Sequence, residues 1–103
     1  MVQQQTEQQD FAHGHQAIAV TIRTPAGINH QFHMNVEERV ATVAKTAERY
    51  FTSHNELAPG AYGMVLLRGD QATEMNDAGR LEDYGVREGG ILVLVAKGPQ
   101  VDG

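Results

Sequence analysis

Apolar and polar residues alternate over two stretches in the first third of the chain. Ile18, Val20 and Ile22 recur at every second position, which is the period of a strand with one buried face. Residues 24–27 then supply a proline and a glycine, which favour a tight turn. The apolar positions after this turn are Ile28, Phe32, Met34 and Val36. The pattern predicts an antiparallel hairpin of two strands.

After this hairpin the apolar residues recur at spacings of three and four, which predicts a helix that ends near His54. We place its start near Asn35, because Asn35 and Glu38 have the spacing of a capping box. Glu37 and Glu38 would also suit the positive end of the helix dipole. One face of the predicted helix is apolar and consists of Val40, Val43, Ala44, Ala47, Tyr50 and Phe51.

Two further apolar runs, residues 62–67 and 91–96, predict two more strands. The turn-rich residues 71–90 between them are expected to hold only short pieces of structure. The predicted fold is α+β, a mixed sheet of four to five strands packed on one main helix, because the hairpin and the helix each have an apolar face to bury. This domain covers residues 17–97, with a disordered arm over residues 1–16 and a flexible tail over residues 98–103.

Composition excludes several classes of protein. The 103 residues carry a formal net charge of −5 and only two lysines, so they offer no basic patch for nucleic acid. The absence of cysteine removes thiol nucleophiles, disulfides and Cys-ligated zinc, and it fits a reducing compartment. The longest apolar run is too short to cross a bilayer, and the Gln-rich start is not a secretory signal. We therefore expect a cytoplasmic protein that binds neither nucleic acid nor membrane.

The closing third of the chain carries the most specific motif. Residues 80–86 read RLEDYGV and residues 87–95 read REGGILVLV. This run resembles the segment that leads into the last strand of ubiquitin, and the order of predicted elements over residues 17–95 is also that of ubiquitin. The resemblance implies a β-grasp fold in which Leu81 and Val86 close the open end of the sheet and Tyr84 bonds to backbone. The short chain and its Gln-rich arm suggest a prokaryotic relative.

The residue Gly103 gives this resemblance a functional meaning. Ubiquitin-like modifiers end in glycine because their carboxylate must thread a narrow channel in an activating enzyme. The resemblance implies a modifier whose Gly103 carboxylate is activated with ATP, with an activating enzyme, a conjugating enzyme, a deconjugating or processing protease and target proteins as partners. Asp102 departs from the usual preceding glycine, and Pro99 restricts the tail. If copies are joined into chains, Lys45 and Lys97 are the candidate acceptors.

Two alternatives share the same fold. One is a non-covalent interaction module, for which Gly103 is dispensable. The other is a sulfur carrier in which Gly103 becomes a thiocarboxylate, although carriers usually end in a pair of glycines and Asp102 breaks that pair. Because one fold hosts modifiers, carriers, adaptors and ferredoxins, the fold alone does not choose between them.

Strand alternation also predicts a binding patch. If Val65 and Leu67 point inward, the residue between them points outward, next to the outward residues of the last strand. The predicted patch consists of Leu66, Val93 and Val95. Exposed apolar clusters often mark partner sites. The alternative is that these residues pack under the N-terminal arm or in a dimer.

No group of side chains in the sequence indicates catalysis. There is no Ser/His/Asp arrangement, phosphate loop or HExxH motif. His30 and His33 are three residues apart on a predicted strand, so they face opposite sides and do not chelate one metal together. We expect a protein that is not an enzyme and that has no metal site or cofactor.

Overall fold

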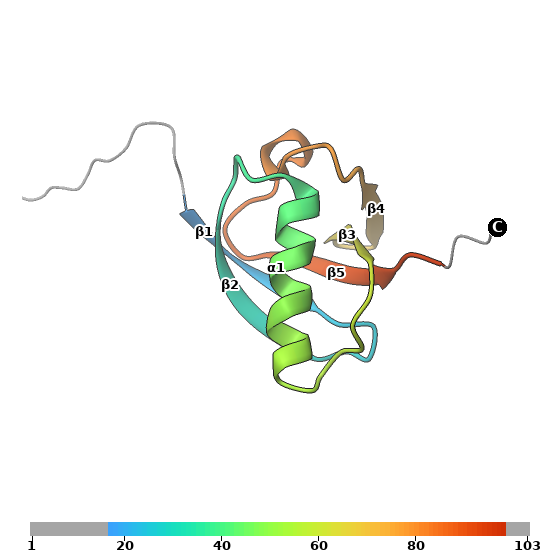
Figure 1. Cartoon of the computed structure of the whole chain (residues 1–103). Coiled ribbons are helices and arrows are strands. Elements are labelled where there is room, and N and C mark those ends of the chain that lie inside the picture. The colour runs from blue at the N-terminus through green and yellow to red at the C-terminus, as the bar shows by residue number, and fades with distance from the viewer. Residues whose placement is uncertain (1–16, 99–103) are drawn as a thin grey trace, which may run out of the picture.

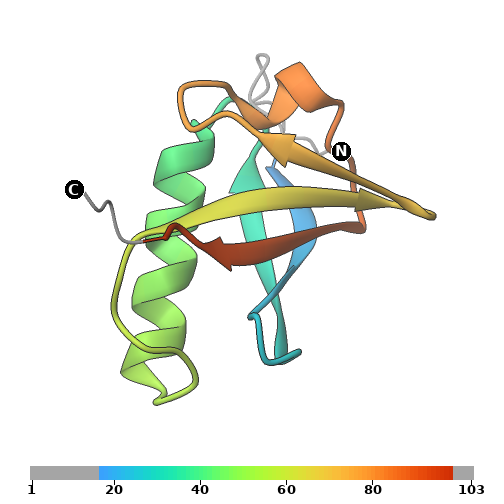
Figure 2. The same ribbon diagram turned by 90° about the vertical axis from the view of Figure 1, so that its right-hand side faces the viewer.

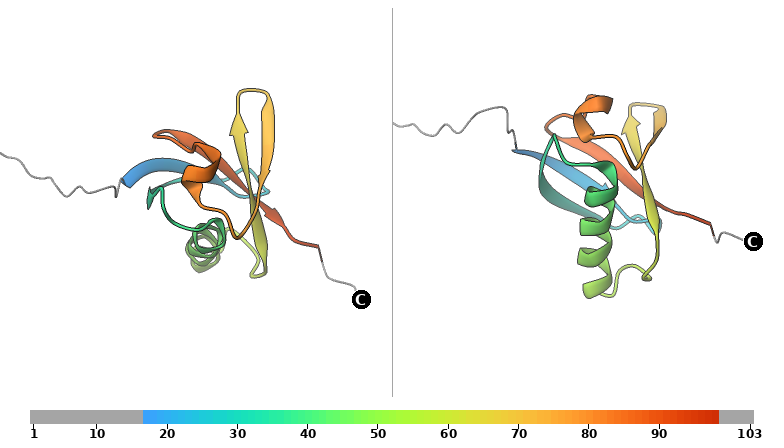
Figure 3. Two further views of the ribbon diagram at one scale, coloured as in Figure 1. Left: turned by 90° about the horizontal axis from the view of Figure 1, so that it is seen from above. Right: turned by 45° about the horizontal axis from the view of Figure 1, so that its top comes forward.

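The computed structural model describes residues 17–98, so the predicted arm over residues 1–16 and the tail beyond Gly98 lie outside the described residues. The elements are β1 (Ala17–Arg23), β2 (Asn29–Asn35), α1 (Val40–Ser53), β3 (Tyr62–Arg68), β4 (Gln71–Met75), the 3₁₀ turn η1 (Leu81–Tyr84) and β5 (Gly90–Ala96). The strands form one sheet in the order β2-β1-β5-β3-β4, and α1 lies across one face of it (Figure 1). Seen from above, helix and sheet make two layers (Figure 3). Because β1 and β5 are parallel and the other pairs antiparallel, the predicted α+β fold with a mixed sheet is confirmed.

The predicted β1–β2 hairpin is present. Its register runs without interruption from Ala17 opposite Asn35 to Arg23 opposite Asn29. The turn is closed by a hydrogen bond of 2.9 Å from the Thr24 N–H to the Ile28 carbonyl. Gly27 adopts φ 94°, a conformation that a residue with a side chain rarely takes. The sequence pattern therefore located both strands and their turn.

The start of α1 differs from the prediction. The helix begins at Val40, with Arg39 at the N-cap position and no side-chain cap. Asn35 and Glu38 do contact each other as a capping box would, since the Asn35 N–H donates to Glu38 Oε2 at 3.3 Å, but this closes a turn ahead of the helix. No acidic residue lies in the first helical turn, so the expected interaction with the helix dipole is absent there. Within residues 17–98, no helix is long and apolar enough to cross a membrane.

The crossing between β3 and β5 contains more regular structure than expected. Residues 71–75 form β4, which pairs antiparallel with β3 from Met64 opposite Met75 to Arg68 opposite Gln71. The two-residue turn between these strands contains Gly69, at φ 61°. This strand was not predicted from the polar sequence QATEM, because four of its five residues are exposed at the edge of the sheet. Edge strands of this kind lack the apolar alternation that marks half-buried ones.

The core lies between α1 and the sheet face that it covers. Phe51 of α1 and Ile22, Leu92 and Leu94 of the sheet are fully buried. As the resemblance implied, Leu81 and Val86 are buried beside them, at the end of the sheet where η1 crosses. The hydroxyl of Tyr84 accepts a hydrogen bond of 2.7 Å from the Asn76 N–H, and this holds the crossing in place. Each fully buried core side chain, such as Phe51 or Leu92, contributes about 1.5–3 kcal/mol of transfer free energy.

Candidate functional site on the outer face of the sheet

The sheet face opposite α1 is not covered by any helix of the described chain (Figure 2). Residues that pair across neighbouring strands point to the same face, so the register identifies the side chains gathered there. Val65 lies opposite Val93, Leu67 lies opposite Ile91, and Gly63 lies opposite Val95. We call the apolar members of this set the outer-face stripe. It consists of Val65, Leu67, Ile91, Val93 and Val95.

One residue of the predicted patch, Leu66, does not lie on the outer face of the sheet. Leu66 is 4% exposed and belongs to the core, whereas its neighbours Val65 and Leu67 are partly exposed. The β3 run is apolar on both faces, so alternation alone cannot decide which residues point inward. The structure places Val93 and Val95 on the outer face, with Val95 38% exposed. Whether this face binds a partner stays a prediction.

Three stripe residues were missed by the sequence analysis: Val65, Leu67 and Ile91. The first two follow from the inverted phase of β3. Ile91 belongs to the same alternating set as Val93 and Val95, so extending the alternation of β5 by one step would have found it.

The stripe has polar flanks of opposite charge. Arg23 of β1 lies beside Val93 in the parallel register, and its guanidinium Nε donates to Asn29 Oδ1 at 2.9 Å. On the other side, Glu74 of β4 lies opposite Val65. One row across the sheet therefore runs from a cation through two valines to an anion. The two ends of this row therefore differ in charge.

A hollow lies at one end of the stripe. Gly63 has no side chain opposite Val95 and is buried, because the Lys97 and Val95 side chains lie over it, with Lys97 Cε 3.6 Å and Val95 Cγ2 3.8 Å from a Cβ built there. The hollow has a volume of about 430 Å³ and is bordered by Glu74, Met75 and Lys97 among others. The hollow lies beside Val95, the most exposed residue of the stripe.

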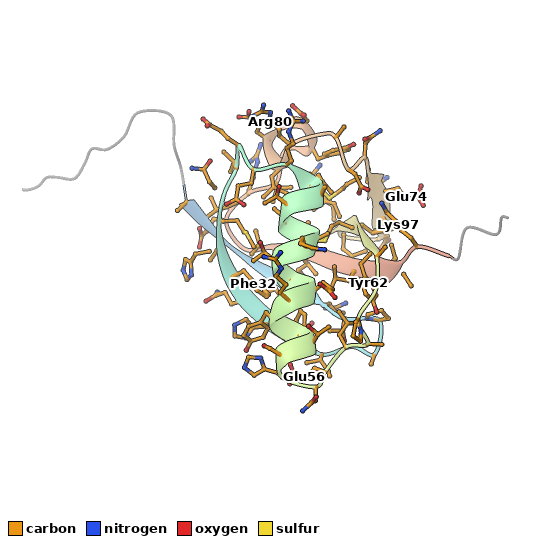
Figure 4. All side chains as sticks on the ribbon, viewed as in Figure 1. Phe32, Glu56, Tyr62, Glu74, Arg80 and Lys97 are labelled. Atoms are coloured by element: carbon orange, nitrogen blue, oxygen red, sulfur yellow. The ribbon has the colours of Figure 1, made fainter. Side chains whose placement is uncertain are left out.

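The two candidate acceptor lysines lie together at another hollow, of about 180 Å³, between α1 and the start of β3. Lys45 is exposed on α1. Lys97 forms an ion pair with Asp77. Figure 4 shows Tyr62 and Lys97 on the side of α1 away from Phe32. No group of three His, Asp or Glu side chains within residues 17–98 could hold a metal ion. Gly103 lies outside the described residues.

Solved structures decide the fold. The C-terminal ubiquitin-like domain of mouse tubulin-specific chaperone e matches with a TM-score of 0.67 and 16% identity, over 91% of this chain and all of that one. The ubiquitin-like domain of an Arabidopsis thaliana protein matches with a TM-score of 0.59 and 18% identity, over 100% and 99% of the two chains. This chain has a ubiquitin-like fold.

Other matches show how widely this ubiquitin-like fold is used. A designed protein based on ubiquitin matches with a TM-score of 0.65 and 14% identity, over 84% of this chain and 96% of that one. A chain from a toluene 4-monooxygenase complex matches with a TM-score of 0.63 and 13% identity, over 80% of this chain and 100% of that one. No family model and no curated protein matches the sequence. These matches thus show a ubiquitin-like fold.

Proposed function

We propose that this protein works by being recognised, as a ubiquitin-like interaction module whose outer-face stripe binds a partner protein. The observation that carries the proposal is the set of five apolar side chains on adjacent strands, on the face that α1 leaves open. Contiguous exposed apolar surface is the usual mark of a protein interface, and a polar rim is its usual border. The partner surface is expected to be apolar, with acidic groups toward Arg23 and basic groups toward Glu74.

A Val93→Asp variant tests this role of the stripe. Val93 lies at the centre of the outer face and is half-buried by its neighbours, so an aspartate there places a carboxylate among apolar contact residues while sparing the core. We expect capture of the partner from an extract of the native source to be lost, and the affinity of the purified pair to fall at least about tenfold. Thr42→Asp adds the same charge on exposed α1 and is the control. Equal binding by all three proteins would contradict the proposal.

We further propose that the protein is a modifier, attached through the carboxylate of Gly103. One feature of the described chain favours this second role. Gly98, the last described residue, is exposed and directly follows the hydrogen bond of 3.0 Å from the Lys97 N–H to the Ala61 carbonyl, so the described chain ends at the surface beyond the last strand. The partners proposed for this role are an activating enzyme, a conjugating enzyme, a protease and target proteins. Lys45 is the more accessible acceptor, because Lys97 forms an ion pair with Asp77.

An experiment in extract with and without ATP distinguishes a modifier from an interaction module. Tagged protein and a version lacking Gly103 are incubated with extract from the native source, and adducts are sought by denaturing gel and mass spectrometry. ATP-dependent adducts that require Gly103 are expected for a modifier. Thiocarboxylate in place of adducts points to a sulfur carrier. Partners that co-purify equally with both versions, with no adduct, leave the interaction module as the function.

A further inference from the structure

We propose that the residues ahead of β1 dock on the outer face of the sheet and cover one end of the outer-face stripe, so that a partner has to displace them. The docking segment is residues 7–12, and Phe11 is the side chain that contacts the apolar surface. This inference rests on the proposed role of the stripe as a partner site, and it adds how access to that site is controlled.

Phe11 is the one aromatic side chain in a polar segment. Residues 3–16 read QQQTEQQDFAHGHQ, in which Phe11 is the only large apolar residue. A segment of this composition has little apolar surface to bury within itself. Its aromatic ring is therefore suited to dock on an apolar surface elsewhere, because a ring buries a large area for the loss of only two side-chain torsions.

The start of β1 lies next to the start of β5, where the stripe begins. The Ala19 carbonyl accepts a hydrogen bond of 2.7 Å from the Gly89 N–H, and the Ala19 N–H donates to Glu88 Oε1 at 3.0 Å. Gly89 leads directly into β5. Ala17 is exposed, and the alternation of β1 places it on the outer face. The residues ahead of β1 therefore join the fold at the outer face, near Ile91.

The register gives the span that the docking segment has to cover. Ile91 pairs with Thr21, which lies four residues beyond Ala17, and Leu67 pairs with Ile91 on the next strand. At about 3.3 Å per residue along a strand and about 4.8 Å between strands, Leu67 lies about 16 Å from Ala17. The six residues from Phe11 to Ala17 extend to about 20 Å. Ile91 and Leu67 are therefore both within the reach of Phe11.

The surface within this reach is apolar. Ile91 of β5 and Leu67 of β3 are directly opposite each other and both are partly exposed, and the two strands lie side by side (Figure 2). The next residue in the same row is Ala72 of β4, which is exposed and small. An aromatic ring laid on the two branched side chains removes apolar surface of all three residues from water.

Charge favours the same placement. The docking segment carries the carboxylates of Glu7 and Asp10, and residues 1–16 contain no Lys or Arg. The β1–β2 hairpin, residues 17–35, contains Arg23 and no carboxylate. Arg23 lies on the outer face, one row beyond the row of Ile91. A segment that runs from the start of β1 past Ile91 brings its carboxylates toward Arg23, so the charges are complementary.

Methyl NMR of the full chain tests this contact without any partner. We expect nuclear Overhauser contacts from the Phe11 ring to the methyl groups of Ile91 and Leu67. None is expected to Val95, which lies about 27 Å from the start of β1 and is out of reach. Phe11→Ser removes the ring and is expected to shift the Ile91 and Leu67 methyl signals. Ala12→Ser makes a polar change at the neighbouring position and is the control, expected to leave those signals in place.

Two NMR results overturn the proposal. One is that Phe11→Ser leaves the Ile91 and Leu67 methyl signals where they are in the unaltered chain. The other comes from a mixture of isotope-labelled and unlabelled chains. Ring contacts that arise only between two different chains in this mixture identify a second copy as the occupant.

The affinity for the stripe partner tests the regulatory consequence. A segment that covers the stripe in about two thirds of the molecules raises the apparent Kd about threefold. Phe11→Ser is therefore expected to lower the Kd at least about threefold, and Ala12→Ser to leave it unchanged. Equal Kd values for the two variants overturn the regulatory role. If Val93→Asp abolishes partner capture while the Phe11 ring makes no contact, only this inference fails. If the ring contact is present and Val93→Asp binds as the unaltered chain does, the partner site fails instead.

Discussion

Leu66 and Val65 are neighbours in β3 that point to opposite faces of the sheet. Leu66 is buried between the sheet and α1, whereas Val65 belongs to the outer-face stripe and is partly exposed. Leu66→Ala is expected to lower the free energy of unfolding by about 2–5 kcal/mol, because a cavity forms in a packed core. Val65→Ala is expected to cost less than about 1 kcal/mol. Urea unfolding of the two variants compares them, and equal losses would show that the assigned faces are wrong.

This pair also shows what residue patterns can and cannot predict. In β1 the period-two pattern predicted the inward residues correctly, because polar Thr21 and Arg23 mark the other face. In β3 nearly every residue is apolar, so the phase was open and Leu66 was placed on the wrong face. When the outer face of a strand is also apolar, as it is in β3, the sequence lacks the alternation of polar and apolar residues from which inward positions are recognised. The site was therefore harder to predict than the fold.

At the scale of the element, the β3–β4 hairpin depends on its turn. Gly69 adopts φ 61°, and a Cβ built there meets no atom within 4 Å, so substitution is opposed by backbone conformation alone. Gly69→Val is expected to lower the free energy of unfolding by about 1–2 kcal/mol. Gly69→Asn is expected to cost less, since asparagine tolerates this conformation. Thermal unfolding ranks the two, and amide exchange is expected to quicken first in β4. A valine variant as stable as the asparagine variant would contradict this account.

Elements with an apolar period were predicted from sequence, and elements held by backbone pairing were not. The spacing of Val40, Val43, Ala47 and Phe51 predicted α1, and all four are buried. β4 was missed, because its contribution is a ladder of backbone bonds to β3 that any polar sequence can form. The capping-box spacing of Asn35 and Glu38 was real but belongs to the turn ahead of α1. Local hydrogen bonds of this kind fit more than one backbone setting.

At the scale of the whole molecule, the last strand of the described residues occupies the middle of the sheet. β5 pairs with β1 on one side and with β3 on the other, so the two hairpins join only through it. Without the residues from Gly90 onward, both hairpins and α1 keep apolar faces that no other described element closes. A chain that lacks β5 exposes these faces to chaperones and proteases. A message cut short before β5 should therefore yield no folded remnant, and the cell holds either the complete domain or a chain ready for degradation.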